Sequence, residues 1–212
     1  MEIDAGLVSA LESQFATEDG VTIIHHDALT VDWNAIADQS HAWAMVANLP
    51  YNVATPLVLD VLDMVPQVTS LLVMVQREVA ERLVAAPGSS NYGIPSVKVA
   101  YWATGELVAR IPPSVFLPQP RVESALVHLV RHEQRKFDAP VEDVFALVRK
   151  AFGQRRKMLR RSLSGIVGQE QFEAAGVAPD ARPEQIDVAG WCALAGAVVA
   201  TTDGTESAGG TS

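Results

Sequence analysis

The chain of 212 residues contains a single cysteine, Cys192. One cysteine cannot form an intramolecular disulfide, and such a composition is typical of a reducing compartment. The sequence also has no apolar run near the roughly 18 residues that a membrane-spanning helix needs, and no basic segment followed by a hydrophobic core at its N-terminus. We therefore expect a cytoplasmic protein that is not inserted in a membrane.

Basic residues are fewer than acidic ones. The chain has 16 Lys and Arg and 25 Asp and Glu, which gives a net charge of −9. That balance argues at first against nucleic acid, but the basic residues are segregated. Between Val144 and Gln169 there is no acidic residue and there are seven basic ones: Arg149, Lys150, Arg155, Arg156, Lys157, Arg160 and Arg161. A basic patch on an acidic protein favours oriented phosphate binding. The alternative is a plain solvated surface, although such a surface normally mixes both signs.

Metal-ligand spacings are also missing. His25 and His26 are adjacent, the chain has one cysteine, and no histidines recur at helical spacing. Zinc sites in proteins combine Cys, His and carboxylate ligands at characteristic spacings. We therefore predict no metal site.

The first half of the chain alternates between patterns of strand and helix type. Apolar runs typical of strands are Val21–His25, Trp43–Leu49 and Leu71–Gln76, and helical patterns cover Gly6–Phe15, Thr55–Met64 and Glu78–Ala86. This alternation predicts an α/β fold with a mostly parallel sheet and helices on its faces.

The second half departs from the alternation. A helix is expected over Asn91–Thr104, followed by two strands, Glu106–Ile111 and Ser124–Arg131, that pair in antiparallel fashion at an edge. A polar linker, Arg131–Pro140, precedes a helical pattern from Val141 to Phe152, which Gly153 ends or bends. We predict a first domain over 1–135, a small all-helical domain over 136–200, and a disordered, polar tail over 201–212.

The segment Asn48-Leu49-Pro50-Tyr51 follows the apolar run Trp43–Ala47 and carries the most functional information. The run reads as a buried strand that ends in a stiff loop, and open α/β sheets place ligands at the carboxyl ends of their strands. The Asn48 side chain and the Leu49 carbonyl offer acceptors for an exocyclic amine, and Tyr51 offers a ring face for a base. A strand-to-helix turn with a satisfied Asn and a packed Tyr is the alternative.

An ordered series of motifs resembles one family over residues 2 to about 165. The matching blocks are Glu2-Ile3-Asp4, His26-Asp27-Ala28-Leu29, Asn48 to Pro56, Val75 to Leu83, Tyr92 to Val97, Pro113 to Ala125 and Ala151 to Lys157. Together they resemble the small-subunit rRNA adenine N6,N6-dimethyltransferases of the KsgA type and, more distantly, the large-subunit rRNA methylases. The resemblance implies a Rossmann-like methyltransferase sheet followed by a small helical domain.

The resemblance also implies roles for particular residues. Glu2 would accept hydrogen bonds from ribose hydroxyls of S-adenosylmethionine, and Asp27 with Ala28 would hold the adenine of that cofactor. Asn48 would also contact the adenosine half of the cofactor. Asn48, Leu49, Tyr51 and Phe116 would bind the flipped adenine of the substrate, with Tyr51 and Phe116 stacking on it. Arg121 would contact a neighbouring phosphate. The alternatives are a frayed end for Glu2, a helix cap for Asp27, a core position for Phe116 and an exposed strand-start charge for Arg121.

The family's first strand and the Gly-rich turn that wraps the cofactor find no counterpart here, and Gly88 and Gly168 do not follow a strand. We therefore expect an N-terminally truncated sheet. The implied function is dimethylation of adenines in a hairpin loop near the 3′ end of small-subunit rRNA, by a monomer acting on a pre-30S particle during ribosome assembly. The alternatives are a catalytically impaired rRNA-binding module and, less favoured, a DNA adenine methyltransferase.

Overall fold

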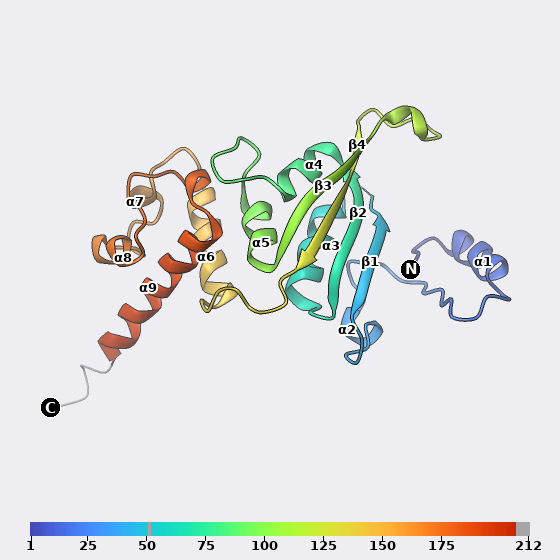
Figure 1. Cartoon of the computed structure of the whole chain (residues 1–212), viewed down its shortest axis with the longest axis horizontal. Helices are drawn as coiled ribbons and strands as arrows, with labels where there is room; N and C mark the ends of the chain where they lie inside the picture. Colours follow the sequence, from blue (N-terminus) through green and yellow to red (C-terminus); the bar gives the residue numbers. More distant parts are fainter. Residues whose placement is uncertain (51, 207–212) are drawn as a thin grey trace.

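A computed structural model describes residues 1–50 and 52–206 of the chain (Figure 1). Its centre is a four-stranded sheet in the order β1-β2-β4-β3. The strands are β1 (Trp43–Asn48), β2 (Val68–Gln76), β3 (Ala103–Ile111) and β4 (Ser124–Arg131). Strands β1 and β2 are parallel, whereas β4 runs antiparallel to both β2 and β3. The expectation of a mostly parallel sheet was wrong, because β3 reaches β4 through a loop rather than through a crossover helix.

Three helices cover one face of this sheet: α3 (Ala54–Met64), α4 (Arg77–Leu83) and α5 (Ile94–Trp102) (Figure 1). In β2, Leu71, Val73 and Val75 are buried against them, and the residues between these are only partly buried. Because successive side chains of a strand point to opposite faces, β2 has one buried face and one partly buried face. The parallel pairing of β1 with β2 places their carboxyl ends at the same edge of the sheet.

The strand expected over Val21–His25 does not form. Only an isolated parallel bridge joins Glu2 to His25, with the Glu2 amide donating to Ile24 O over 3.0 Å and the His26 amide donating to Glu2 O over 3.1 Å. An apolar run becomes a strand only where a ladder of partners is available, and among the described residues this run forms one backbone bridge. Helix α1 (Ala5–Gln14) lies beyond β1 in Figure 1, and the short helix α2 (Trp33–Ile36) precedes β1.

The C-terminal part is helical, with α6 (Val141–Phe152), α7 (Leu159–Ser162), α8 (Gln169–Ala174) and α9 (Val188–Glu206). Gly153 caps α6, as the sequence predicts. These helices pack around a second hydrophobic core that includes Val148, Leu159 and Trp191. Helix α9 contains the first six residues of the tail expected to be disordered, and the Thr201 hydroxyl accepts a hydrogen bond from Gln171. Residues 207–212 lie outside the described residues.

Helix α5 belongs to both cores, because Val99 packs in the sheet core while Val97 and Tyr101 pack in the helical one. Residues 132–140 contain no helix or strand, as expected of the linker. Arg131 lies at its start, as the last residue of β4. The shared helix and the connecting segment thus join the sheet to the helical region.

Candidate active site

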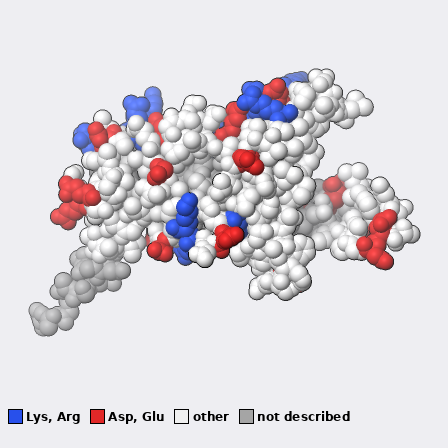
Figure 2. All heavy atoms as spheres, in the orientation of Figure 1, with Lys and Arg blue, Asp and Glu red and all other residues white. Residues whose placement is uncertain are grey.

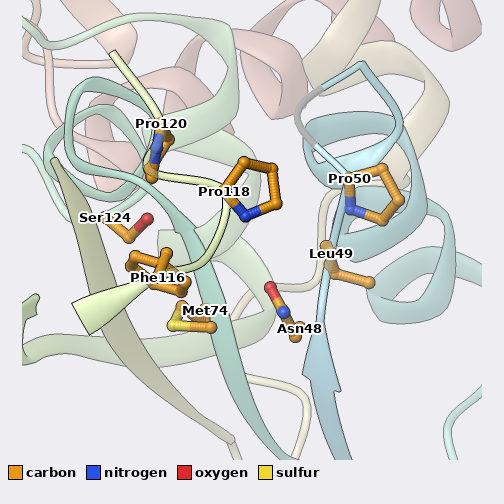
Figure 3. A pocket seen from close by; sticks show the side chains of 8 residues that line it. All are labelled: Asn48, Leu49, Pro50, Met74, Phe116, Pro118, Pro120 and Ser124. Atoms are coloured by element: carbon orange, nitrogen blue, oxygen red, sulfur yellow. The ribbon is translucent and has the colours of Figure 1, made fainter. Parts of the chain in front are cut away.

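A cavity of about 440 Å³ opens at the carboxyl ends of β1 and β2. Its lining residues are Asn48, Leu49, Pro50, Met74, Phe116, Pro118, Pro120 and Ser124. Figure 3 shows Asn48 and the Phe116 ring on opposite sides of the cavity, with Met74 between them and Pro118 and Pro50 above. The structure therefore brings together the Asn48 turn and the Phe116 loop, which are far apart in the sequence.

The parallel pairing of β1 with β2 places Asn48 at the cavity. Asn48 lies opposite Met74 in the ladder, and the Leu49 amide donates to Met74 O over 3.0 Å, one residue past the strand. Pro50 follows, and its carbonyl accepts hydrogen bonds from the amides of Val53 and Ala54 at the start of α3. Leu49 is 7% exposed and anchors the turn in the core.

Two acceptors in this turn are open. Among the described residues, no group donates a hydrogen bond to the Asn48 side-chain oxygen or to the Leu49 carbonyl. Open acceptors beside a cavity can bind a donor from a ligand, since unpaired polar groups lose free energy when they are covered without a partner. Tyr51, the third member predicted for this site, lies outside the described residues.

Phe116 reaches the cavity from the loop between β3 and β4. The 3-10 helix η1 (Pro113–Val115) precedes it, and the amides of Val115 and Phe116 donate to Pro112 O and Pro113 O over 3.3 and 3.2 Å. Proline fixes φ, so a loop with several prolines has few conformations available. Phe116 is partly buried and lines the cavity, which differs from a core position beneath the loop.

Sequence analysis missed the contact that holds the end of this loop. The Arg77 amide donates to Glu123 O over 2.9 Å, and the Arg77 guanidinium lies 2.5 Å from Glu123 Oε2 and 3.6 Å from Glu81 Oε1. Arg77 follows β2 directly, and Glu123 precedes Ser124, which lines the cavity. An Arg just after a strand, with acids in the next helix and in the loop, was the available signal. The pair fixes the Phe116 loop to the strand that carries Met74.

Of the four residues expected at the cofactor, Asn48 lines the cavity, and Glu2, Asp27 and Ala28 lie elsewhere. Glu2 Oε1 accepts hydrogen bonds from the amides of Ile3 and Asp4 over 2.8 and 2.9 Å, and Asp27 Oδ1 accepts one from Leu29 over 2.9 Å. Asp27 thus caps a turn at residues 28–30 and not a helix, because the next helix, α2, is capped by Asp32. Neither these carboxylates nor Ala28 line the cavity with Asn48. The bridge from Glu2 to His25 nevertheless puts the two carboxylates on adjoining segments, and each keeps an oxygen that no described residue occupies.

The chemistry of this pair fits the adenosine half of S-adenosylmethionine. A carboxylate oxygen accepts hydrogen bonds only, which suits ribose hydroxyls and an adenine amine.

In the described part of the chain, no cluster of three or more His, Cys, Asp or Glu side chains is arranged to hold a metal ion. No helix among the described residues is long and apolar enough to cross a membrane.

The seven basic residues are exposed and lie on three consecutive pieces of chain. Arg149 and Lys150 lie in the last turn of α6, Arg160 and Arg161 lie on α7, and the turn between holds the other three. Figure 2 shows Lys and Arg atoms along the upper side of the molecule, over the helical region and again near the pocket loop. Among the described residues, six of the seven make no ion pair.

Arg155 differs from the other six. Its guanidinium donates to Ser90 O over 2.9 Å, and its Nε lies 3.8 Å from Glu184 Oε2. The Gly88 amide also donates to Glu184 O, and the Tyr92 hydroxyl donates to Ile186 O over 2.9 Å. Arg155 thus ties the loop after α4 to the helical region. Arg121, by contrast, is exposed beside Pro120 of the cavity and has no ion-pair partner in the described part of the chain.

The sequence pattern of the family "Ribosomal RNA adenine dimethylase" matches residues 1–198. The chain is 42% identical to a "Ribosomal RNA small subunit methyltransferase A" of Bifidobacterium longum, over 97% of this chain and 73% of the relative. A protein of the same name from Kineococcus radiotolerans is 50% identical over 72% of this chain and 52% of its own length. The chain belongs to the ribosomal RNA adenine dimethylase family.

Two solved structures agree with this family fold. A dimethyladenosine transferase from Plasmodium falciparum superposes with a TM-score of 0.74 at 20% identity, covering 91% of this chain and 78% of that one. The 23S rRNA methyltransferase ErmE superposes with a TM-score of 0.68 at 19% identity, over 93% of this chain and 80% of its own. At such identities the likeness shows the fold, and it confirms the Rossmann-like methyltransferase architecture with a C-terminal helical region.

Proposed function

We propose that the chain transfers methyl groups from S-adenosylmethionine to N6 of adenines in a hairpin loop near the 3′ end of small-subunit rRNA. The observation that carries this proposal is that Asn48, Leu49 and Phe116 line the same cavity. Its volume of about 440 Å³ is in the range of small-ligand sites. Acceptors on one side and a ring on the other suit a planar base with an exocyclic amine.

The acceptors address the main chemical obstacle. The N6 amine of adenine is a poor nucleophile because its lone pair is delocalised into the purine ring. Hydrogen bonds from its two N–H groups to the Asn48 side-chain oxygen and the Leu49 carbonyl localise that lone pair. The same acceptors stabilise the positive charge that N6 gains during methyl transfer, and such preorganised groups are a large source of catalysis. After one transfer, a second needs the monomethyl amine to re-enter the cavity.

S-adenosylmethionine supplies a methyl group activated by its sulfonium. Glu2, Asp27 and Ala28 are the residues we assign to its adenosine half, together with Asn48. Positioning of the amine within near-attack distance of that methyl group is then the main task of the chain. Phe116 stacks on the extruded adenine, which offsets part of the cost of unstacking it.

The exposed basic residues bind the RNA backbone in this account. Arg121 lies beside the cavity and is assigned to a phosphate next to the target base, and the cluster Arg149 to Arg161 to phosphates farther away. Single-stranded loops are the usual targets of specific RNA recognition because their base edges are free. We assign residues 1–135 to catalysis and 136–200 to RNA binding, in a cytoplasmic monomer that acts on a pre-30S particle during ribosome assembly.

Transfer of tritium from methyl-labelled S-adenosylmethionine to RNA tests the proposal. A synthetic hairpin with the 3′-terminal loop of small-subunit rRNA should become labelled, and the same hairpin with its loop adenines replaced by guanines should not. Label on both hairpins, or on neither at millimolar cofactor, would contradict the proposal.

One observation favours a second candidate, an rRNA-binding module with impaired catalysis. Of the residues assigned to the cofactor, only Asn48 lines the cavity. In that case the unlabelled hairpin would still bind with an affinity that depends on the basic cluster. Binding without labelling would therefore select this candidate.

A further inference from the structure

Leu117 is fully exposed and lies in the chain between two residues that line the cavity. Its side chain is 99% exposed, more than any other large hydrophobic side chain in the described part of the chain. Its neighbours Phe116 and Pro118 both line the cavity, and Leu117 does not. A large apolar side chain between two pocket residues therefore lies outside the pocket, in water.

The loop gives Leu117 little freedom to fold back. Pro112, Pro113, Pro118 and Pro120 restrict its backbone. The Arg77–Glu123 pair fixes its far end to β2. Exposed apolar area near a binding site is a common sign of a surface that becomes covered on association. Val115 and Val122 of the same loop are also exposed, at 63% and 43%.

We propose that Leu117 is a wedge that contacts the base next to the target adenine when that adenine enters the cavity. This proposal rests on the proposed function. A base that leaves a stack opens a gap beside its neighbours, and proteins commonly fill such gaps with Leu, Phe, Ile or Met. Phe116 holds the extruded adenine, so the residue next to it reaches the place that the adenine left.

The partner is a base of unpaired RNA rather than another protein. The apolar loop adjoins a cavity suited to a purine, and the exposed Arg121 of the same loop provides a charge for a phosphate. The leucine side chain has no hydrogen-bonding group, so it cannot distinguish one base from another. Its contact depends instead on whether the neighbouring bases can separate. Leu117 would therefore favour flexible loops over duplex in general.

A fluorescent base placed next to the target adenine tests the wedge without requiring methyl transfer. The rRNA hairpin carries 2-aminopurine next to the target adenine, and fluorescence reports loss of stacking while anisotropy reports binding. On binding the unaltered chain, fluorescence should rise. Leu117→Ala should lower that rise roughly threefold or more, and Leu117→Met should retain it. Leu7→Ala, which shortens a 55% exposed leucine on α1, is the matched control and should behave like the unaltered chain.

A second hairpin separates wedging from loop packing. It has an abasic site on the other side of the target adenine, so that less stacking must be broken. The deficit of Leu117→Ala should largely disappear with this hairpin, and a persistent deficit would overturn the wedge. An equal fluorescence rise for Leu117→Ala and the unaltered chain would refute the wedge and leave the proposed function intact. Binding of the unaltered chain without any rise would refute base extrusion, and the wedge with it.

Discussion

Asn48 and Phe116 line one cavity from opposite sides, although Asn48 ends β1 and Phe116 lies in the loop between β3 and β4. Strand β4 makes this possible, because it pairs with β2 on one side and β3 on the other. Because β4 runs antiparallel to β2 and β3, the loop between β3 and β4 lies at the carboxyl ends of β1 and β2. An acceptor and a ring thereby meet without being near in sequence.

Phe116→Ala should weaken binding of the rRNA hairpin. Stacking of a base on an aromatic ring contributes about 1–3 kcal/mol, which corresponds to roughly 5- to 150-fold in Kd. Fluorescence anisotropy at fixed salt measures the change. Phe116→Tyr keeps a ring and should bind within about twofold of the unaltered chain. An unchanged Kd for Phe116→Ala would remove the ring from base binding.

The basic cluster should make RNA affinity depend steeply on salt. Each phosphate contact adds about 0.7–0.9 to the slope of log affinity against log salt. Arg156→Glu with Arg160→Glu should therefore weaken binding and flatten the slope, and should leave unfolding nearly unchanged because both side chains are exposed.

The matched control for this double variant is Lys136→Glu with Arg82→Glu, which changes the net charge equally outside the cluster. If the two double variants shifted affinity and slope by the same amount, the cluster would act only through the net charge of the chain. Arg155 is left unaltered in both, because it bonds Ser90 and pairs with Glu184.

Arg131→Ala should destabilise the fold by about 3 kcal/mol, since its hydrogen bonds are made by a charged, partly buried group. The guanidinium donates to the carbonyls of Val61, Leu62, Val65 and Val68 over 2.9–3.2 Å. It also lies over the Trp102 ring at 5.7 Å. Burial lowers the pKa of Arg131, and the nearby Asp63 opposes that change. Urea unfolding followed by circular dichroism measures the effect.

Arg82→Ala is the control for Arg131. Its ion pair with Glu78 joins two exposed side chains one turn apart on α4. Such pairs contribute at most about 0.5 kcal/mol. Equal losses for the two variants would show that the carbonyl contacts of Arg131 do not stabilise the fold.

Affinity for S-adenosylmethionine should be weaker than micromolar. Glu2 and Asp27 each use one carboxylate oxygen in a local turn, and neither lines the cavity with Asn48. The cofactor would therefore gain few simultaneous contacts. Isothermal titration checks this, with Asp27→Asn expected to weaken binding further. A micromolar Kd for the unaltered chain would refute this expectation.

The elements that sequence analysis predicted well are those with strong local patterns. Helix α3 and strands β1 and β4 match their expected limits within about a residue, since apolar periodicity is a local feature and Pro50 and Pro66 closely follow β1 and α3. The strand at Val21–His25 failed for the opposite reason: its apolar run is strand-like, but pairing depends on a partner ladder that sequence alone does not reveal.

The site was also predictable in part, where local features mark its residues. The Asn48 turn and the Phe116 loop are marked by prolines and by family resemblance, and they do meet. The exposure of Leu117 depends on tertiary placement, and the position of Arg77 after a strand does not by itself identify Glu123 as its partner. Arg155 was grouped with its basic neighbours, because its partners Ser90 and Glu184 are distant in sequence.

The most direct test of the account is the modified base itself, measured with and without the Asn48 acceptor. The rRNA hairpin is incubated with S-adenosylmethionine at millimolar concentration, digested to nucleosides and analysed by mass spectrometry. The unaltered chain should give N6,N6-dimethyladenosine. Asn48→Ala should form it about 100-fold more slowly or worse, with hairpin affinity nearly unchanged, and Asn34→Ala, an exposed asparagine that bonds Met64 O at the end of α3, should not slow it. Equal rates for Asn48→Ala and the unaltered chain would contradict the account.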